Sequence, residues 1–212
     1  MFDVRIFLNS MMNAKSPSLT LSSGNAHKVT EIRDMLGIPL RSLKDVPDAP
    51  DFEETGTTFE ANARIKARGL ADFIGGWALA DDSGLAVNAL DGAPGVYSAR
   101  YAGIHGDDAA NNAKLLADLA EISDRGAAFV CVLALCGPGG KEWIIRGECR
   151  GRIARAASGS NGFGYDPLFI PEGFEQSFAE LGSGEKNRIS HRSVALRKLI
   201  GHPDDPLARF RS

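Results

Sequence analysis

Two acidic motifs in this 212-residue chain have the residue types of a magnesium site. Asp81 and Asp82 open the string DDSG. Glu53 and Glu54 open the string EETG, just ahead of a predicted helix. Magnesium is commonly held by one or two carboxylates together with substrate phosphates and water. Neighbouring strand residues point to opposite faces, so only one of the two aspartates can face a given site. The alternatives are an ordinary turn at DDSG and a solvated acidic loop at EETG.

A glycine turn that joins a predicted strand to a predicted helix has the features of a phosphate site. Its residues are Ser23, Gly24, Asn25, Ala26, His27 and Lys28. Free backbone N–H groups at a helix start, together with the helix dipole, favour an anion. Lys28 lies in the first turn, where the dipole disfavours a cation, which indicates that it serves a ligand. Lys66 and Lys186 add two amines near the ends of other elements. The chain has no GxxxxGK[ST] P-loop, and a helix capped by Asn25 is the plain alternative.

A glycine-rich loop in the last third of the chain has the features of a site for a flat base. It comprises Asn161, Gly162, Phe163, Gly164, Tyr165 and Asp166. The flanking glycines expose the Phe163 ring, which suits stacking on a nucleotide base. Further polar residues follow at Glu185, Lys186, Asn187, Ser190, His191 and Arg192. Taken alone, His191 is typical of an ordinary helix start.

The elements that must position these residues alternate between strand and helix in the first half. Expected strands are 18–22 and 77–80, and expected helices are 28–36, one from Thr57 or Thr58, one from Asp107 or Asp108 to about Ile122, and 190–200. Strands 127–135 and 142–151 flank a Gly-Pro-Gly-Gly turn and predict a hairpin. The pattern predicts an α/β fold with an elongated central mixed sheet and helices on both sides.

The strand at 77–80 is expected to end at the aspartates, and 84–106 is expected to be mostly loop. Open α/β sheets bind ligands beyond the carboxyl ends of their strands, so the aspartates would lie at such an edge. We expect a single domain over residues 18–201, with an N-terminal extension at 1–17 and a tail at 202–212. Translation could equally begin at Met11 or Met12.

Composition narrows the class of protein. The formal charge is −3, whereas a non-specific nucleic-acid binder normally carries a basic excess, so no nucleic-acid partner is expected. No stretch approaches the roughly 18 apolar residues that span a bilayer, so no membrane association is expected. The three cysteines form no CxxC pair, and their odd number predicts a reduced, cytoplasmic protein.

Taken together in this order, five strings resemble the inosine triphosphate pyrophosphatase family, also called the XTP/dITP diphosphatases. They are SSGNAHK at 22–28, EETGTTFEANARIKA at 53–67, ALADDSGLAVNALDGAPGVYSARYAG at 78–103, GFGYDPLF at 162–169 and EKNRISHR at 185–192. The resemblance covers nearly all of residues 19–199. It implies two lobes around a substrate cleft, a homodimer, and Mg²⁺-dependent hydrolysis of ITP, dITP and XTP to the monophosphate and pyrophosphate.

The resemblance also implies roles for individual residues. The turn from Ser23 to Lys28 matches the triphosphate-binding turn, with Ser in place of the usual Thr. Glu54 and Asp82 match the metal ligands, and Asp82 also matches the general base. The substrate-binding residues that match are Lys66, Ser83, Phe163, Gly164, Tyr165, Asp166, Lys186, His191 and Arg192. The resemblance leaves open whether Glu53 and Asp81, which adjoin the matched acids, also contact the metal.

Three other functions remain open at this point. A related pyrophosphatase could act on modified pyrimidine triphosphates. A nucleotide sensor could bind without hydrolysis, although such a protein has little need of the acids Glu54 and Asp82. A nucleic-acid-binding module is disfavoured by the net charge.

Overall fold

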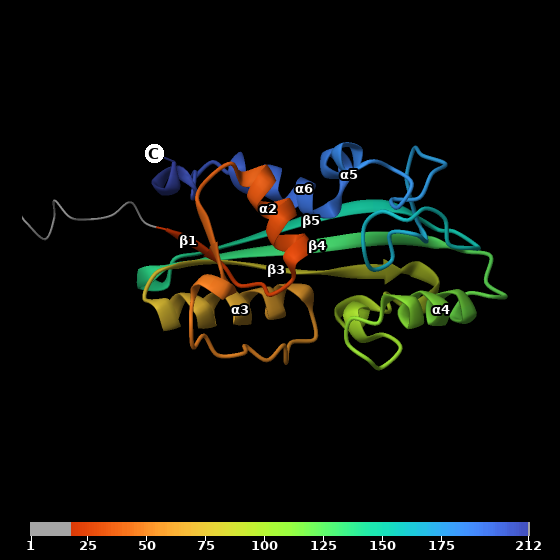
Figure 1. Ribbon diagram of the computed structural model, residues 1–212, viewed down its shortest axis with the longest axis horizontal. Helices are drawn as coiled ribbons and strands as arrows, with labels where there is room; N and C mark the ends of the chain where they lie inside the picture. Colours follow the sequence, from red (N-terminus) through yellow and green to blue (C-terminus); the bar gives the residue numbers. More distant parts are fainter. Residues whose placement is uncertain (1–17, 212) are drawn as a thin grey trace, which may run out of the picture.

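The computed structural model describes residues 18–211, so the predicted extension at 1–17 lies outside the described residues. Six strands form one sheet: β1 (Leu19–Leu21), β2 (Leu40–Ser42), β3 (Trp77–Val87), β4 (Gly126–Cys136), β5 (Glu142–Ile153) and β6 (Phe169–Pro171). The α-helices are α2 (Ala26–Leu36), α3 (Phe59–Ile74), α4 (Asp108–Asp118), α5 (Ser183–Ile189) and α6 (His191–Ile200). Figure 1 shows α2, α5 and α6 over one face of the elongated sheet and α3 and α4 over the other.

The sheet is mixed, as the sequence predicts. Its strand order is β2-β1-β3-β4-β5-β6. The pairs of β1 with β2 and with β3 are parallel, whereas β3, β4, β5 and β6 pair antiparallel in succession. The predicted hairpin is confirmed as β4 and β5, which pair along the long axis of the sheet (Figure 1).

The expected end of the third strand at Ala80 is wrong. β3 continues through Asp81 and Asp82 to Val87, with Asp81 opposite Leu133 and Asp82 opposite Val132 in the ladder with β4. Asp, Ser and Gly are poor strand formers, but pairing along β4 overrides this local preference. The aspartates therefore lie within the sheet and not beyond a strand end. β1 ends nearby at Leu21, so the glycine turn lies beside them.

Helix ends follow the predicted signals closely. The Asn25 side chain accepts hydrogen bonds from the N–H groups at the start of α2, and Gly37 ends the helix in the left-handed conformation. Thr58 caps α3 and Asp107 caps α4, which ends at Asp118, earlier than expected. Ser190, the first residue of the helix expected at 190–200, is the cap of α6. Strands β2 and β6 and helix α5 are additional to the expected elements.

Three apolar clusters hold the helices on the sheet. The first packs α6 and the buried Leu207 and Phe210 of the chain end against β1, β3 and β4. The second joins α4 to the far end of the sheet, and the third packs α3 against the other face of β3 and β4. α6 approaches β5 so closely that a Cβ at Gly147 would lie 2.3 Å from the His191 carbonyl oxygen.

The structure can be compared with two expectations from the composition, one on disulfides and one on membrane-spanning segments. Cys131, Cys136 and Cys149 are all buried and free of disulfides, as the cysteine pattern predicts. Across residues 18–211, none of the helices has the length and apolar character that crossing a bilayer requires.

Candidate active site

The sequence-predicted site residues meet in one cleft of about 1240 Å³. It is lined by the β1–α2 turn, the loop before α3, the middle of β3, the loop before α4, the glycine-rich loop and the start of α6. Every predicted site residue lines this cleft except Ala26. Segments more than 100 residues apart in sequence, such as Ser83 and Arg192, are thus brought together.

The phosphate-type turn differs from the expectation in one respect. The Asn25 side chain already accepts hydrogen bonds from the backbone N–H groups of His27, at 3.0 Å, and Lys28, at 3.2 Å. The Asn25 N–H in turn donates to the Ser23 hydroxyl at 3.2 Å. The turn is therefore ordered by its own polar groups, and fewer N–H groups are free for an anion than the sequence suggests.

The Lys66 amine joins the two predicted metal ligands. It donates to Glu54 Oε1 at 2.7 Å, to Asp82 Oδ1 at 2.8 Å and to the Asp81 carbonyl oxygen at 2.9 Å. Lys66, Glu54 and Asp82 come from α3, the loop before it and β3, so tertiary packing creates the group. Arg100 lies at the limit of ion pairing, 4.0 Å from Glu54.

The pKa values of the two acids in this group are shifted in opposite directions. Burial raises the pKa of Asp82, and this effect exceeds the lowering by the Lys66 charge. Burial also acts to raise the pKa of Glu54, but Lys66, together with Lys28 and Arg100, outweighs burial and the pKa is lowered. Burial acts to lower the pKa of Lys66, yet the two carboxylates raise it, so the amine stays charged. One cation is therefore shared between two acids.

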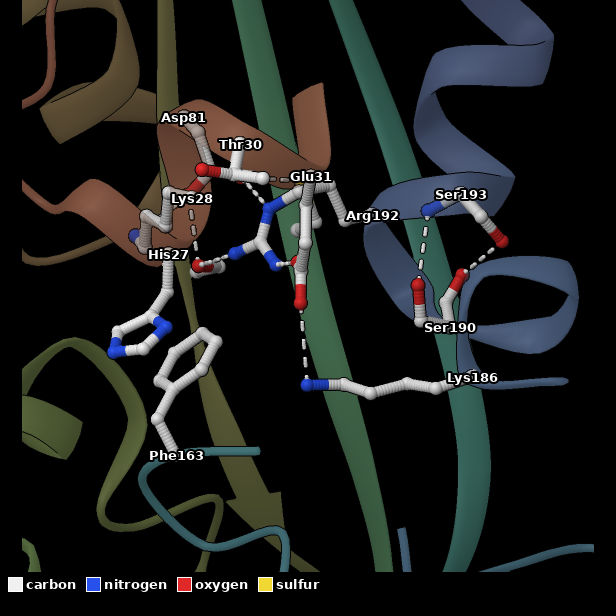
Figure 2. A network of polar contacts seen from close by, with 12 residues as sticks. His27, Lys28, Thr30, Glu31, Asp81, Phe163, Lys186, Ser190, Arg192 and Ser193 are labelled. Atoms are coloured by element: carbon white, nitrogen blue, oxygen red, sulfur yellow. Dashed lines mark hydrogen bonds and ion pairs between the residues drawn. The ribbon is translucent and has the colours of Figure 1, made fainter. Parts of the chain in front are cut away.

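Asp81 points to the opposite face of β3. Its carboxylate accepts hydrogen bonds from Lys28 Nζ at 2.6 Å and from Arg192 Nε at 2.9 Å (Figure 2). Ser83 Oγ donates to Asp81 at 2.8 Å, and Cys131 Sγ lies 3.1 Å away. Although Asp81 is buried, which acts to raise the pKa of its carboxyl, Arg192 and Lys28 hold that pKa well below the ordinary value. Asp81 is thus a fully paired anion.

Glu31 of α2 is a cleft-side residue that sequence reasoning missed. It forms ion pairs with Arg192 and, at 3.3 Å, with Lys186 (Figure 2). Lys186 also donates to Asp166 Oδ2 at 2.7 Å. Glu31 lies three positions after Lys28, and helix residues at this spacing share a face. That spacing is the signal that could have found it.

The three lysines of the cleft are all engaged by carboxylates of the protein. Lys28 pairs with Asp81, Lys66 pairs with Glu54 and Asp82, and Lys186 pairs with Asp166 and Glu31. The nitrogen–oxygen distances of these pairs run from 2.6 to 3.3 Å. A bound polyanion must therefore share each amine with a carboxylate. An ammonium group has three donors, so Lys28 and Lys186 keep N–H groups for a ligand, whereas Lys66 already uses all three.

The glycine-rich loop presents Phe163 to the cleft. The Phe163 N–H donates to Asp166 at 2.9 Å, and the ring stacks on His27 with centroids 5.3 Å apart (Figure 2). Gly162 and Gly164 have φ values of 80° and 62°, which favour glycine.

Two residues of α4 hold this loop, and the sequence analysis did not assign either of them to the site. Asp108 accepts from the Gly164 N–H at 2.7 Å, and Asn112 donates to the Gly164 carbonyl oxygen at 2.9 Å. They are spaced one helical turn apart. Each holds one side of the same residue, so α4 sets the position of the loop.

His191 lies at the inner end of the cleft. It is 5% exposed and stacks on Phe129, with centroids 4.9 Å apart. Burial and the neighbouring Arg192 charge hold its pKa well below the ordinary value, so the imidazole is neutral. Its buried Nδ1 has no hydrogen-bond partner within the described part of the chain. Such an orphaned polar atom is typical of a site that a ligand completes.

Comparison with known proteins shows the family of this chain. A model of the Ham1 family matches residues 19–202, which is most of the chain. This chain belongs to the Ham1 family. Two relatives of this Ham1 chain bear the name dITP/XTP pyrophosphatase. That of Exiguobacterium sp. is 52% identical over 184 residues, which are 85% of this chain and 94% of the relative. That of Streptomyces coelicolor is 49% identical over 189 residues, 86% of this chain and 94% of the relative.

Solved Ham1 structures have the same fold. The Ham1 protein of Staphylococcus aureus superposes with a TM-score of 0.82 at 38% identity, covering 89% of this chain and 98% of that one. A HAM1 protein from Coxiella burnetii gives a TM-score of 0.80 at 45% identity, covering 86% and 96%. The α/β fold predicted from the sequence is therefore the Ham1 fold.

The acids of the Ham1 cleft have the donor chemistry for a divalent metal ion whose other ligands come from phosphate and water. Among residues 18–211, no group of three or more His, Cys, Asp and Glu side chains is arranged to hold a metal by itself. Glu54 and Asp82 nevertheless meet on one amine, and two carboxylates are what Mg²⁺ uses when phosphates and water supply its other ligands.

Proposed function

We propose that this chain hydrolyses non-canonical purine nucleoside triphosphates, namely ITP, dITP and XTP, to the monophosphate and pyrophosphate with Mg²⁺ as cofactor. The observation that carries the proposal is the pair of carboxylates, Glu54 and Asp82, joined through Lys66 in a cleft that also holds Lys28 and Lys186. The names of the curated relatives support the same activity.

The phosphate end of the substrate would lie between the β1–α2 turn and Lys66. Lys28 would give its remaining N–H donors to phosphate oxygens while staying paired with Asp81. Lys66 already uses its three N–H groups on Glu54, Asp82 and the Asp81 carbonyl oxygen, so it would redirect one of them to phosphate. Glu54 and Asp82 would hold Mg²⁺, which supplies charge neutralisation on the polyphosphate when it is bound. Asp82 would orient and deprotonate the attacking water, and its raised pKa makes it a better proton acceptor than an ordinary aspartate.

The base end would lie against Phe163. Lys186 Nζ lies 4.7 Å from the centroid of this ring, and His191 and Arg192 line the same cleft. Hypoxanthine and xanthine carry a 6-oxo acceptor, whereas adenine carries an amino donor. Donors from His191 or Arg192 would be satisfied by the oxo group and left unpaired by ATP. Such a site can discriminate by as much as about 10⁴–10⁵.

Three further expectations belong to this proposal. The partner is a small-molecule nucleotide and not nucleic acid. The chain works as a homodimer, which sedimentation analysis would measure. It works in the cytoplasm, in keeping with its three free cysteines.

The test is hydrolysis by the purified chain. With Mg²⁺ we expect ITP, dITP and XTP to yield pyrophosphate, little turnover of ATP, and loss of activity on chelation. The same assay with modified pyrimidine triphosphates tests the alternative that the chain is a related pyrophosphatase with a different base preference. Release of orthophosphate, or turnover of ATP comparable to that of ITP, would contradict the proposal.

A further inference from the structure

Asp81 has no role in the function proposed above, although it is one of the most buried charged groups of the cleft. Its side chain has no exposed surface, and it lies on the face of β3 opposite to Asp82. We infer that Asp81 is a positioning residue that holds Lys28 and Arg192 for the two ends of the nucleotide, and that it is not a metal ligand. The inference deepens the proposed function and rests on it.

The hydrogen-bonding capacity of Asp81 is filled by the protein. A carboxylate has about four acceptor positions, two on each oxygen. Oδ1 accepts from Lys28 Nζ at 2.6 Å and from Ser83 Oγ at 2.8 Å. Oδ2 accepts from Arg192 Nε at 2.9 Å and from Cys131 Sγ at 3.1 Å. No acceptor position remains for a cation, in contrast to Asp82, whose carboxylate accepts from Lys66 through one oxygen.

The two cations that Asp81 holds come from two different elements that line the cleft. Lys28 comes from the start of α2, in the turn at 23–28, and Arg192 comes from the start of α6. Lys28 precedes Asp81 by 53 positions, and Arg192 follows it by 111. Both side chains are long and rotamer-rich, and fixing them on one buried anion removes most of this freedom before the nucleotide binds.

Both cations keep donors for a ligand. Lys28 uses one of its three N–H groups on Asp81. Arg192 uses Nε on Asp81, one terminal nitrogen on Glu31 and the other on Ser83 Oγ, at 3.1 Å, so two of its five N–H groups remain. Ser83 bridges Arg192 and Asp81, because its hydroxyl accepts a hydrogen bond from Arg192 and donates one to Asp81. The single carboxylate of Asp81 thus orients the remaining N–H donors of both Lys28 and Arg192.

The test uses Asp81→Asn, which keeps the shape and removes the charge and one acceptor atom. For ITP we expect KM to rise at least about tenfold, because the phosphate end loses its oriented amine. We expect the ratio of kcat/KM for ITP to that for ATP to fall by a similar factor, because the base end loses its oriented guanidinium. The affinity for Mg²⁺ alone, measured by calorimetric titration, should change less than about twofold.

A matched control and a double-mutant cycle separate positioning from general damage. Cys131→Ala removes a neutral neighbour of Asp81 and should alter KM and selectivity less than about threefold. In a Lys28→Met background, Asp81→Asn should raise KM much less than it does in the wild type, because the amine it positions is gone. A purely structural role would give the same loss in both backgrounds.

A measurement on the unaltered chain covers the case in which Asp81→Asn does not fold. The Nε–H resonance of Arg192, assigned by its loss in Arg192→Lys, should be protected from exchange and unmoved by Mg²⁺. Weaker Mg²⁺ binding by Asp81→Asn, unchanged KM and selectivity in the folded variant, or movement of that resonance on adding Mg²⁺ would each overturn the inference. If wild-type chain fails to hydrolyse ITP, the proposed function fails instead, and the calorimetric and resonance measurements still decide the role of Asp81.

Discussion

The two faces of β3 treat neighbouring aspartates in opposite ways. On the face toward α2 and α6, Asp81 is bonded to two cations, Lys28 and Arg192, and its pKa is held well below the ordinary value. On the face toward α3, Asp82 shares the single amine of Lys66 with Glu54, and burial raises its pKa. The first carboxylate is amply compensated by positive charge, and the second is not.

This difference shows how one strand can give two identical residues different chemistry. Alternation along the strand sends the side chains into separate environments, and the surrounding charges then set each pKa. A carboxylate with too little positive charge around it attracts a cation, whereas a carboxylate that is already paired with two cations does not. The comparison supports our proposal that metal binding and proton transfer belong to the Asp82 face and substrate positioning to the Asp81 face.

The largest effect that would sharpen this comparison is expected from Asp82→Asn. Loss of the carboxylate removes the proton acceptor, so kcat for ITP should fall by about 10²–10⁴. The fold should remain, as judged by circular dichroism and thermal unfolding. Near-full activity of the variant would break the assignment of the two faces.

Lys66→Met tests whether the Asp82 face lacks positive charge. The amine and a divalent cation compete for Glu54 and Asp82, so the variant should bind Mg²⁺ more tightly. A tenfold gain corresponds to about 1.4 kcal/mol and a further rise of about 3–5 °C in melting temperature on adding Mg²⁺. We expect kcat/KM for ITP to fall by about 10², because the amine no longer reaches phosphate. Equal Mg²⁺ shifts in the variant and the wild type would argue against competition.

The pH dependence of kcat/KM offers a third test. A raised pKa means that Asp82 takes up a proton at a higher pH than an ordinary aspartate, and it then no longer accepts one from water. The acid limb should therefore have its midpoint above 3.8, the ordinary value for aspartate. Asp81, whose pKa is lowered, should not contribute to this limb. A midpoint below that ordinary value would contradict the proposed environment of Asp82.

The smallest effect is expected from a change behind the Asp81 face. In Gly147→Ala the new Cβ would meet the His191 carbonyl oxygen at 2.3 Å and the Ala195 nitrogen at 2.4 Å, which pushes α6 from β5. We expect about 1–3 kcal/mol of destabilisation by thermal unfolding, with a modest rise in KM for ITP. Gly184→Ala is the matched control, because a Cβ there has no neighbour within 4 Å. Equal stability of the two variants would show that α6 does not depend on this close approach.

Much of the fold could be predicted from local signals. Asn25 and Gly37 mark the ends of α2, Ser190 marks the start of α6, and the Gly-Pro-Gly-Gly turn joins the long hairpin. The path of β3 could not be predicted, because Asp-Asp-Ser-Gly is typical of a turn and becomes a strand only by pairing with β4. Strands β2 and β6 are three residues each, too short to show a period.

The candidate site could be predicted as a set of residues but not as a set of pairs. The acids, lysines and Phe163 do line one cleft, and their roles stay predictions. The ion pairs between Lys28 and Asp81 and between Arg192 and Asp81 join distant segments, and nothing in the local sequence indicates them. Glu31 could have been predicted from its spacing of three residues from Lys28 on one helix. The contacts of Asp108 and Asn112 could not, because they depend on where α4 meets the glycine-rich loop.

The pairing of Asp81 with Leu133 and of Asp82 with Val132 makes the site sensitive to chain length as well as to residue type. Deleting one residue of β3 ahead of the aspartates would shift the strand by one position and exchange its two faces. The carboxylate that now meets Lys66 would be turned toward the other layer of helices, although every reactive residue would still be encoded. Homologous genes should therefore tolerate insertions in the loops around this strand far better than within it.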